Sequence, residues 1–404
     1  MNKNNIPNPA AEGRFILLLG ALTTFGPLPI DLHLPALPAI AAGLAASADA
    51  VELTITVFLA GFSLGMLFYG PLSDRYGRRR VMLGGIALFT LASLACVLAT
   101  AVEQLIAARF LQALGGGAAS VLARAVVRDV YTHTEAIRKL SLIAMITAIA
   151  PLAAPLIGSV LLDSFGWRGT FAALLAWGVL SLAVVWHQLP ETLPAERRGQ
   201  LPLGRAFAAY GDLLRDPVAL GLVLAGGMSF AAMFAYVTAS PFYFIELEGF
   251  SPTAFGVLFG INALGILAAN YVNSHLVRRR GAAAMAGTGS FFGFLGALIL
   301  LSAVGVPGGL PAVIGGLFLV VSMTGLLGAN CVGILMSRYP NNTGAAAALF
   351  GASQFGLGML ASAAVSYHHD GSGRPMAWAI LLATATSVLG YLLFRRSQGR
   401  VPAP

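Results

Sequence analysis

Twelve long apolar runs, joined by short polar turns, constrain the fold of this chain of 404 residues more than any other feature. A helix needs about 20 apolar residues to cross a bilayer. Hydrophobic residues make up 57% of the sequence and charged residues only 10%, which excludes an ordinary soluble domain. The runs predict membrane spans at 15–38, 50–70, 82–101, 104–126, 140–162, 169–188, 218–240, 253–274, 283–304, 311–336, 344–366 and 376–394.

Positive charges are distributed unevenly between alternate connections. The connections on the side of the termini hold arginines at 78–80, 278–280 and 395–396, whereas the other side keeps little beyond Arg168 and Arg374. Cytoplasmic loops are enriched in Lys and Arg, so we expect both termini to be cytoplasmic. This topology accounts for the net charge of +8, and no nucleic-acid partner is expected.

The sequence divides into two similar halves. A polar connection at 189–216 separates the first six runs from the last six, and LGMLFYGPLSDRYGRRR from Leu64 is echoed by LGILAANYVNSHLVRRR from Leu264. Duplicated halves with a binding site between them are common in secondary transporters. We therefore predict an all-α membrane protein whose twelve transmembrane helices form two pseudo-symmetric six-helix bundles, at 1–188 and 217–404, with 189–216 as a cytoplasmic linker.

Asp31, in PIDLHLPALP, is the one acid that lies well inside a predicted span. Glu52, Glu103, Glu246 and Glu248 lie near the outer ends of theirs. A charged carboxylate in hydrocarbon costs about 2.5–3.5 kcal/mol, so a residue of this kind is expected to be functional. The four prolines within 27–38 should break the helix around Asp31, so that the freed backbone lines a cavity.

Arg109 lies at a similar depth in the fourth span. A nearby guanidinium favours the ionised form of Asp31, whereas burial favours the neutral form. We hypothesise a switch in which Asp31 binds a proton from outside when separated from Arg109 and releases it toward the cytoplasm in the other state. The alternatives are a permanent Asp31–Arg109 clamp without proton traffic, and an Arg109 that snorkels to the outer interface. His33 is expected at the outer interface.

The loop after the second span reads GPLSDRYGRRR, in which glycines permit a tight turn and an acid lies among arginines. It resembles the signature loop of the major facilitator superfamily. The matching positions are Gly70, Leu72, Asp74, Arg75, Gly77, Arg78 and Arg79. The resemblance implies that Asp74 contacts the N-terminal end of the eleventh span, near 342–344, and steadies the outward-open state. A simple positive-inside loop would explain the arginines but not the acid or the glycines.

Two further segments extend this resemblance. Arg109 and Gln112 match the superfamily pattern R-x-x-Q-G, with Ala113 in place of the glycine. The fifth span is similar to the antiporter motif of the superfamily, although several of its glycines are replaced by other small residues. The positions that carry this similarity are Ala150, Ala154, Pro155 and Gly158. Small residues at this spacing let another helix approach closely, and Gly256 and Gly260 are expected to form the partner face.

Aromatic and methionine side chains on the central spans suit varied apolar molecules. The candidates for a substrate cavity are Phe25, Phe58, Phe62, Met145, Met228, Met233, Phe234, Tyr236, Asn262, Gln354 and Phe355. No fixed charge for a phosphate or dicarboxylate is expected in the core, which argues against exchange of organic anions.

The segments DLHLPALPAI, RFLQALGGG, VVRDVY and FGWRGTF resemble the Bcr/CflA drug-resistance branch of the superfamily. The resemblance implies a monomeric antiporter of the bacterial inner membrane that exports chloramphenicol- or bicyclomycin-like drugs in exchange for protons. The proton gradient would supply the energy, and no cofactor is expected. The partners would be the drug, protons and the lipid bilayer.

Other functions stay open as alternatives. An exporter of a metabolite such as an amino acid, or a solute importer, would share the same fold. A membrane enzyme is disfavoured, because the sequence has no catalytic triad, metal-ligand motif or phosphate loop. His368 and His369, in HHDGSGRP, are expected to be solvated and to bind no metal.

Overall fold

The computed structural model describes residues 9–199 and 203–398, and within these ranges every regular element is a helix. The first part of the chain forms α1 (Pro9–Thr23), α2 (Leu28–Asp31), η1 (Leu34–Ala36), α3 (Leu37–Gly43), α4 (Ala48–Tyr76), α5 (Arg78–Leu98), α6 (Val102–Val130), α7 (His133–Phe165) and α8 (Trp167–Gln188). The connection contains η2 (Ala195–Arg197) and α9 (Leu203–Arg215). The last part forms α10 (Pro217–Pro241), η3 (Phe242–Leu247), α11 (Pro252–Arg280), α12 (Ala282–Ala303), α13 (Leu310–Arg338), η4 (Pro340–Asn342), α14 (Thr343–Tyr367) and α15 (Arg374–Ser397).

These helices confirm the predicted fold class. Eleven of the described helices are long and apolar enough to cross a membrane, and the bent pair formed by Glu12–Thr23 and Leu28–Gly43 makes the twelfth span. The two parts of that pair meet at 53°, which confirms the predicted break. Proline residues cause it, because they remove backbone donors and clash with the preceding turn.

Local sequence signals set several helix ends. A capping box of Thr132 and Glu135 starts α7, and the side chain of Asp216 accepts a hydrogen bond of 2.9 Å from the Val218 amide at the start of α10. Gly77 and Gly281 adopt φ of 95° and 81°, a region that favours glycine, in the sharp turns between α4 and α5 and between α11 and α12.

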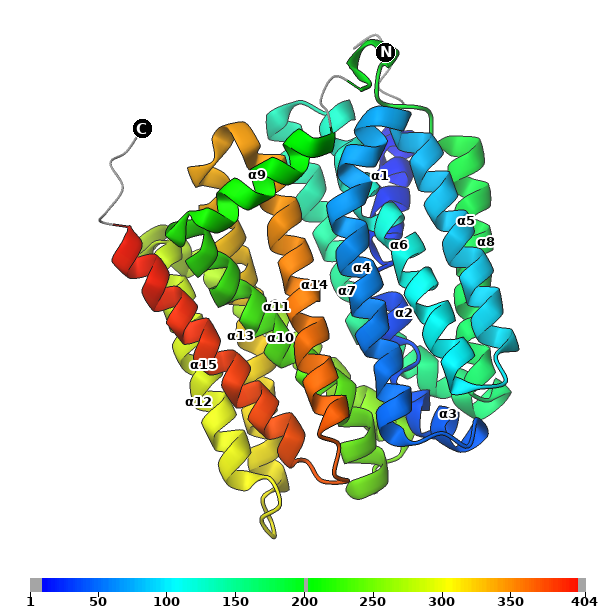
Figure 1. The fold of residues 1–404 in the computed structure, drawn as a ribbon, viewed down its shortest axis with the longest axis vertical. Helices are drawn as coiled ribbons and strands as arrows, with labels where there is room; N and C mark the ends of the chain where they lie inside the picture. Colours follow the sequence, from blue (N-terminus) through cyan, green and yellow to red (C-terminus); the bar gives the residue numbers. More distant parts are fainter. Residues whose placement is uncertain (1–8, 200–202, 399–404) are drawn as a thin grey trace.

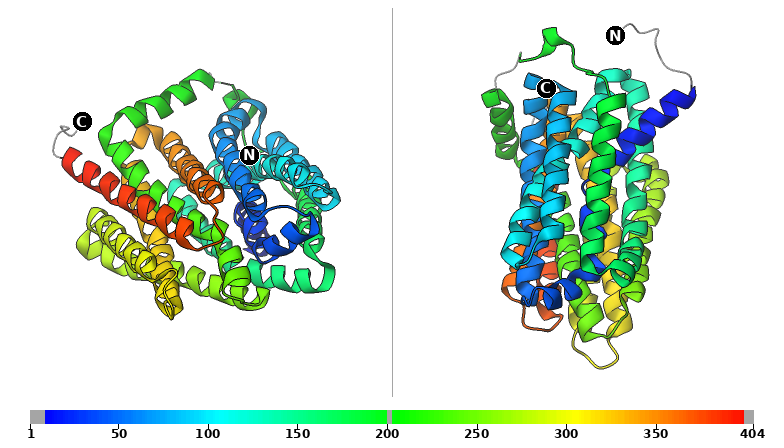
Figure 2. Two further views of the ribbon diagram at one scale, coloured as in Figure 1. Left: turned by 60° about the horizontal axis from the view of Figure 1, so that its bottom comes forward. Right: turned by 90° about the vertical axis from the view of Figure 1, so that its right-hand side faces the viewer.

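The start of α1, the end of α15, these two turns and α9 lie at the same end of the bundle, which we call the arginine-rich end (Figure 1). The α3 helix and the connection between α14 and α15 lie at the other end, called here the opposite end. Helices before residue 189 pack mainly against one another, as do helices after residue 216. The main contacts between the two groups are α4 with α14 and α7 with α11 (Figures 1 and 2). The boundaries of the two predicted domains stay a prediction.

The predicted linker is more ordered than its polar composition suggested. The α9 helix contacts α10, α14 and α4, and it crosses the arginine-rich end in Figure 1. The Phe207 ring lies 5.2 Å from that of Phe68, and the Tyr210 hydroxyl donates a hydrogen bond of 3.4 Å to the Leu67 carbonyl. The connection therefore touches both groups of helices.

Candidate functional site

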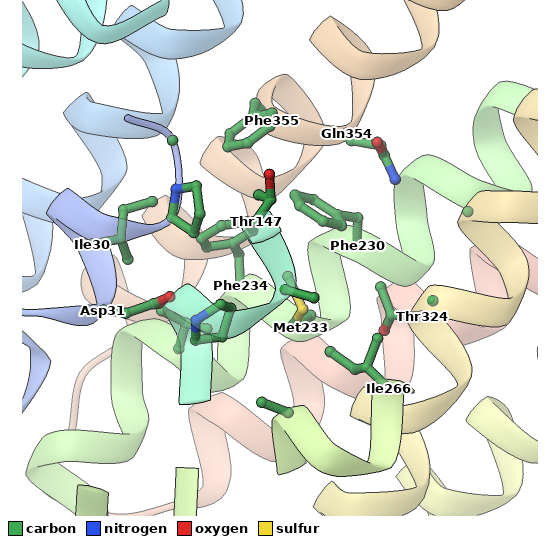
Figure 3. A pocket seen from close by; sticks show the side chains of 18 of the residues that line it. Ile30, Asp31, Thr147, Phe230, Met233, Phe234, Ile266, Thr324, Gln354 and Phe355 are labelled. Carbon is green, nitrogen blue, oxygen red and sulfur yellow. The ribbon is translucent and has the colours of Figure 1, made fainter. Parts of the chain in front are cut away.

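A cavity of about 590 Å³ lies between the two groups of helices. Its walls come from α1, α2, α4, α6 and α7 on one side and from α10, α11, α13 and α14 on the other. Aromatic rings dominate the lining, and Figure 3 shows Phe230, Phe234 and Phe355 around its centre. Its size and apolar walls with few polar groups are typical of a site for a small organic molecule.

Asp31 is the acid in this lining. It is the last residue of α2, directly after the break in the first span, and its side chain reaches the cavity (Figure 3). The residue is 6% exposed. Within the described ranges, no donor forms a hydrogen bond with its carboxyl group and no cation lies within ion-pair distance. Asp31 is therefore free to bind a proton or a donor group of a substrate.

Arg109 is fully buried and lies outside the cavity lining. Its Nη1 donates a hydrogen bond of 2.6 Å to Oε1 of Gln112, and Nε2 of Gln112 donates one of 2.8 Å to Ser93. The guanidinium lies 4.3 Å from the centre of the Phe58 ring, a cation–π contact. The structure thus contains no Asp31–Arg109 clamp, and Arg109 does not snorkel to an interface.

His33 is buried as well, so its predicted position at the outer interface is wrong. Its Nδ1 lies 3.0 Å from the Pro29 carbonyl, and its ring lies 5.6 Å from that of Phe171. The guanidinium of Arg109 lies 5.8 Å from the same Phe171 ring.

Most of the predicted cavity residues line the cavity. Those that do are Phe62, Met233, Phe234, Tyr236, Asn262, Gln354 and Phe355. The amide of Asn262 donates a hydrogen bond of 2.9 Å to the Tyr236 hydroxyl, which fixes both side chains in the wall. Met233, Phe234 and Tyr236 come from α10, and the others come from α4, α11 and α14.

Four predicted cavity residues lie elsewhere. Phe25 packs edge-on against Phe89, 4.6 Å away, and Phe58 lies under Arg109. Met228 packs against the apolar core. Met145 is 67% exposed on the surface of the bundle, because it is half a turn from the cavity-facing Ile143 and Thr147 on α7.

Arg124, on α6, is a cavity residue that the sequence analysis missed. Its Nη2 donates a hydrogen bond of 3.1 Å to the Ser120 hydroxyl and its Nε one of 3.2 Å to the Ser120 carbonyl. No acid of the described residues pairs with it. The expectation that the core has no fixed charge for an anion is therefore wrong. Its position inside a predicted span, 104–126, is the sequence signal that could have identified it.

The small residues of α7 let neighbouring segments lie close to this helix. A Cβ at Gly256 of α11 would lie 3.3 Å from the Pro155 carbonyl, which confirms the predicted contact between these helices. Ala154 is fully buried, and Ala150 nearly so. Gly158 has a different partner, since its Cα lies directly against the Leu32 carbonyl, one residue after Asp31. Gly158 thus supports the broken span that positions Asp31.

The signature loop forms a network of charges within the first group of helices. Arg78 pairs with Asp74 at 2.6 Å and with Asp129 of α6 at 2.9 Å, and its backbone amide donates a hydrogen bond of 2.9 Å to Glu191. The sequence analysis did not identify Glu191. Gly70 has open space around it, and Arg75 lies over the Tyr76 ring.

Among the described residues, no hydrogen bond or ion pair joins Asp74 to the start of α14 in this conformation. The described bonds of Asp74 go to Arg78 and, through its carbonyl, to Gly199. Arg128 instead lies near Gly344, 3.8 Å from the position that a Cβ would take. The resemblance links the Asp74 contact to the outward-open state, and here the cavity lining runs from Asp31 to the exposed Arg124 near the arginine-rich end.

Buried hydroxyl groups close the opposite end between the two groups of helices. Thr56 of α4 lies 2.7 Å from Ser362 of α14, which lies 2.8 Å from Thr238 of α10. Beyond them, His369 lies 3.3 Å from Glu52. The expectation of a solvated side chain holds only in part for His369, whose side chain is 24% exposed because the turn after α14 folds it onto α4. His368 is exposed, as expected. His, Cys, Asp and Glu form no cluster of three suited to a metal ion among the residues described.

Comparison with known proteins is consistent with this architecture. The family model described as Major Facilitator Superfamily matches residues 19–363. An uncharacterized MFS-type transporter of Bacillus subtilis, YdgK, is 36% identical over 391 residues, which are 96% of this chain and 96% of that protein. The bicyclomycin resistance protein homolog of Haemophilus influenzae is 31% identical over 378 residues, 93% of this chain and 95% of that protein.

Among solved structures, the crystal structure of a D-xylose-proton symporter superposes with a TM-score of 0.74, covering 98% of each chain. Its sequence identity to this chain is 18%, so the likeness bears on the fold alone.

Proposed function

The chain belongs to the major facilitator superfamily, whose members are transporters rather than enzymes, and we propose that it exports small apolar or weakly polar drugs in exchange for protons. The observation that carries this proposal is the cavity of about 590 Å³, which combines an aromatic lining with the unpaired carboxyl group of Asp31. The similarity to a bicyclomycin resistance protein homolog supports a drug as the cargo.

The proposed orientation places the arginine-rich end in the cytoplasm of a bacterium and the opposite end outside the inner membrane. Positive charge at that end supports it. The cavity then opens toward the cytoplasm beside Arg124, and the bonds of Thr56, Ser362 and Thr238 close the outer end. A single chain contains both walls of the cavity, so we propose that a monomer is the working unit.

Proton coupling is assigned to Asp31. In the conformation described, Asp31 has no cation to hold it ionised, and the cavity connects it to the cytoplasmic side. In the outward-open state we propose that Asp31 takes a proton from outside, and that in the inward-open state the drug replaces that proton. Arg109, whose Nε and Nη2 have no hydrogen-bond partner among the described residues, is proposed to approach Asp31 in one part of the cycle.

The two motifs are proposed to control the rocking of residues 1–188 against 217–404. Asp74 and Arg75 of the signature loop would gate the cytoplasmic end, with Gly70, Gly77 and Arg78 shaping the loop. The antiporter motif would form the pivot, because Pro155 lies against Gly256 of the other half. Ala150 and Ala154 keep α7 narrow, and Gly158 leaves room for the Leu32 carbonyl of the first span.

Everted membrane vesicles test the proposal. With an acidic lumen, vesicles that contain the wild-type chain should accumulate labelled chloramphenicol, and Asp31→Asn should abolish this accumulation. Asp163→Asn, which changes an exposed acid of α7, is the matched control and should behave as wild type. Equal transport by Asp31→Asn and wild type would remove Asp31 from the mechanism. Absence of accumulation in wild-type vesicles would reject chloramphenicol export.

A counterflow measurement separates proton transfer from a structural role. If Asp31 carries the proton, Asp31→Asn should still exchange labelled for unlabelled drug without a gradient, because that exchange needs no net proton movement. If Asp31 serves only to hold the fold, exchange and thermal stability should fall together.

A second candidate function follows from Arg124. Arg124 and Asp31 both line the cavity, so it offers a cation and an acid to one substrate, which suits a zwitterion such as an amino acid. Labelled amino acids should then accumulate in the same vesicles, and Arg124→Gln should reduce this transport by tenfold or more, about the effect of losing a charged hydrogen bond. Arg128→Gln, outside the cavity lining, is the control. Absence of amino-acid transport by wild type would reject this candidate.

A further inference from the structure

A buried acid and a histidine meet where α4 contacts α14 at the opposite end. Glu52 of α4 has no exposed surface, and neither carboxylate oxygen has a partner with hydrogen-bond geometry among the described residues. Nδ1 of His369, in the turn after α14, lies 3.3 Å from Oε1 of Glu52. A buried carboxylate is stable only if it is protonated or paired with a cation. The protonation of this pair therefore decides how well the contact holds.

The pair lies in a row of polar contacts that joins the two groups of helices. Thr56 is one turn from Glu52 on the same face of α4 and contacts Ser362 of α14. Two turns further, the Ser63 hydroxyl donates a hydrogen bond of 2.8 Å to the Ala352 carbonyl. Hydroxyl groups do not titrate near neutral pH, so Glu52–His369 is the member of this row whose charge can change.

His369 can exchange protons with the solution although Glu52 cannot. The His369 side chain is 24% exposed and that of Glu52 is 0% exposed. A separate cavity of about 250 Å³ reaches His369 and is lined by Tyr243, Glu246, Gly371 and Ser372, among others. Glu246 and Ser372 are exposed, so this cavity leads from the opposite end to the imidazole.

We propose that Glu52 and His369 form a second proton-binding site, distinct from Asp31, at which a proton from the outer solution completes an ion pair that holds the outer end closed. The proton binds to the imidazole, and the imidazolium then neutralises the buried carboxylate of Glu52. When His369 is neutral, Glu52 lacks a cation and the closed contact is weaker. Histidine switches of this kind act near physiological pH.

The surroundings of His369 favour its charged form. The Glu52 carboxylate is the main cause of a pKa above the ordinary 6.5, burial opposes it, and Asp49 and Asp370 add to it. Hydrogen bonds from Ser372 lower the pKa of Asp370, which keeps that acid ionised. Glu246 lines the adjacent cavity, while Tyr243 beside it lies against Gly373. Two neighbouring basic side chains have other partners, since exposed His368 bonds the Ala364 carbonyl and Arg374 lies near Gly305.

The raised pKa of His369 determines how closure of the outer end depends on pH. A histidine with a higher pKa in the closed state stabilises that state fully at pH values below its ordinary pKa. This stabilisation is lost as the pH rises through the higher value. Acid outside the cell should therefore favour closure of the outer end. This part rests on the proposed function, because closure after proton uptake is the step that would carry a proton-loaded exporter toward its inward-open state.

Distance measurements by double electron–electron resonance test this site. Spin labels at Glu103→Cys and Val306→Cys, exposed positions on the two groups of helices at the opposite end, report its opening. In nanodiscs, the labelled chain with no further substitution should show a ratio of closed to open outer ends that rises severalfold as the pH falls from 8.5 to 5.5. His369→Gln and Glu52→Gln should both lose this dependence.

His368→Gln is the matched control, because it removes the neighbouring histidine, which contacts only its own helix, and it should keep the dependence. An unchanged pH response in a folded His369→Gln protein would overturn the proposal, as would its loss in His368→Gln. Thermal melting establishes that each variant is folded. The pH response should survive Asp31→Asn, so failure of drug export and failure of this site are separate outcomes.

Discussion

At the opposite end, the two groups of helices are joined by buried contacts that cross from one group to the other, whereas the ion pairs described at the arginine-rich end lie within one group or within the connection. Thr56 and Ser362 share a short hydroxyl contact across the boundary, and Thr238 contacts Ser362 from within the second group. Arg78 pairs with Asp74 and Asp129, both from its own group. Contacts that cross the boundary hold the two groups together, whereas ion pairs within a group stabilise that group alone.

On the proposed function, this difference explains how the cavity can open at the arginine-rich end. Contacts between the groups are lost only if the groups separate, so they act as a seal. Charges that pair within one group leave the other group free to move. The exposed Arg124 in the cavity wall lies near this arginine-rich end. Under the same proposal, rigid-body motion about the α7–α11 contact would open the two ends of the bundle in turn.

The largest expected effect comes from filling the close contact beside the broken span. Gly158→Val places a branched side chain against the Leu32 carbonyl, which is backbone and cannot move aside without shifting Asp31. We expect proton-driven drug accumulation in vesicles to fall by about two orders of magnitude, the scale seen when a reacting group is misplaced by about 1 Å. A folded Gly158→Val protein with normal transport would show that the opposite end tolerates a shift of this span.

Gly260→Ala is the control for this substitution. Its added Cβ would lie 3.7 Å from the Leu152 carbonyl, an ordinary van der Waals distance at the boundary between α7 and α11. Its transport should match wild type.

The next effect concerns the charges of the arginine-rich end. Arg78→Ala removes the cation shared by Asp74 and Asp129 and leaves Asp129, whose side chain is 18% exposed, without its partner. We expect the free energy of unfolding to fall by about 3 kcal/mol, measured by thermal or denaturant unfolding in detergent. Arg75→Ala, which removes an exposed arginine from the same loop, should change it by less than about 0.5 kcal/mol. Equal effects would mean that the network does not hold the loop.

The smallest effect concerns the seal at the opposite end. Thr56→Val removes one hydroxyl of the crossing contact but leaves Ser362 bonded to Thr238. The loss of one net hydrogen bond, about 1 kcal/mol, should shift the ratio of closed to open outer ends about fivefold toward open. Spin-label distances at Glu103→Cys and Val306→Cys measure this ratio. Thr386→Val, whose hydroxyl bonds only its own helix, should leave the ratio unchanged.

Much of the fold could be predicted because a bilayer leaves few choices. Every predicted span corresponds to a helix, and the prolines around Asp31 break the first one. Seven of the eleven predicted cavity residues line the cavity, since central helices carry them. Met145 shows where this reasoning fails: span positions give the depth of a residue, but the rotation of α7 decides whether it meets lipid or cavity.

The pairing of charges was least predictable. His369 and Glu52 are 317 positions apart, and no local pattern indicates that a turn after α14 returns to α4. Arg109 and Asp31 lie at similar predicted depth, yet Gln112, Phe58 and Phe171 surround the guanidinium instead. Which polar groups meet depends on how separate helices pack, and that packing is decided over the whole bundle.

By itself, the sequence determined that this chain crosses a membrane as twelve helical spans, with a break around a lone acid, because apolar length, proline and charge act locally along the chain. Only the tertiary structure decided that Asp31 faces a cavity without its expected arginine, that Arg124 supplies a cation to that cavity, and that Glu52 and His369 join the two groups of helices. The physical reason is that a side chain's ionisation and partners depend on the helices that surround it, which only long-range packing brings together.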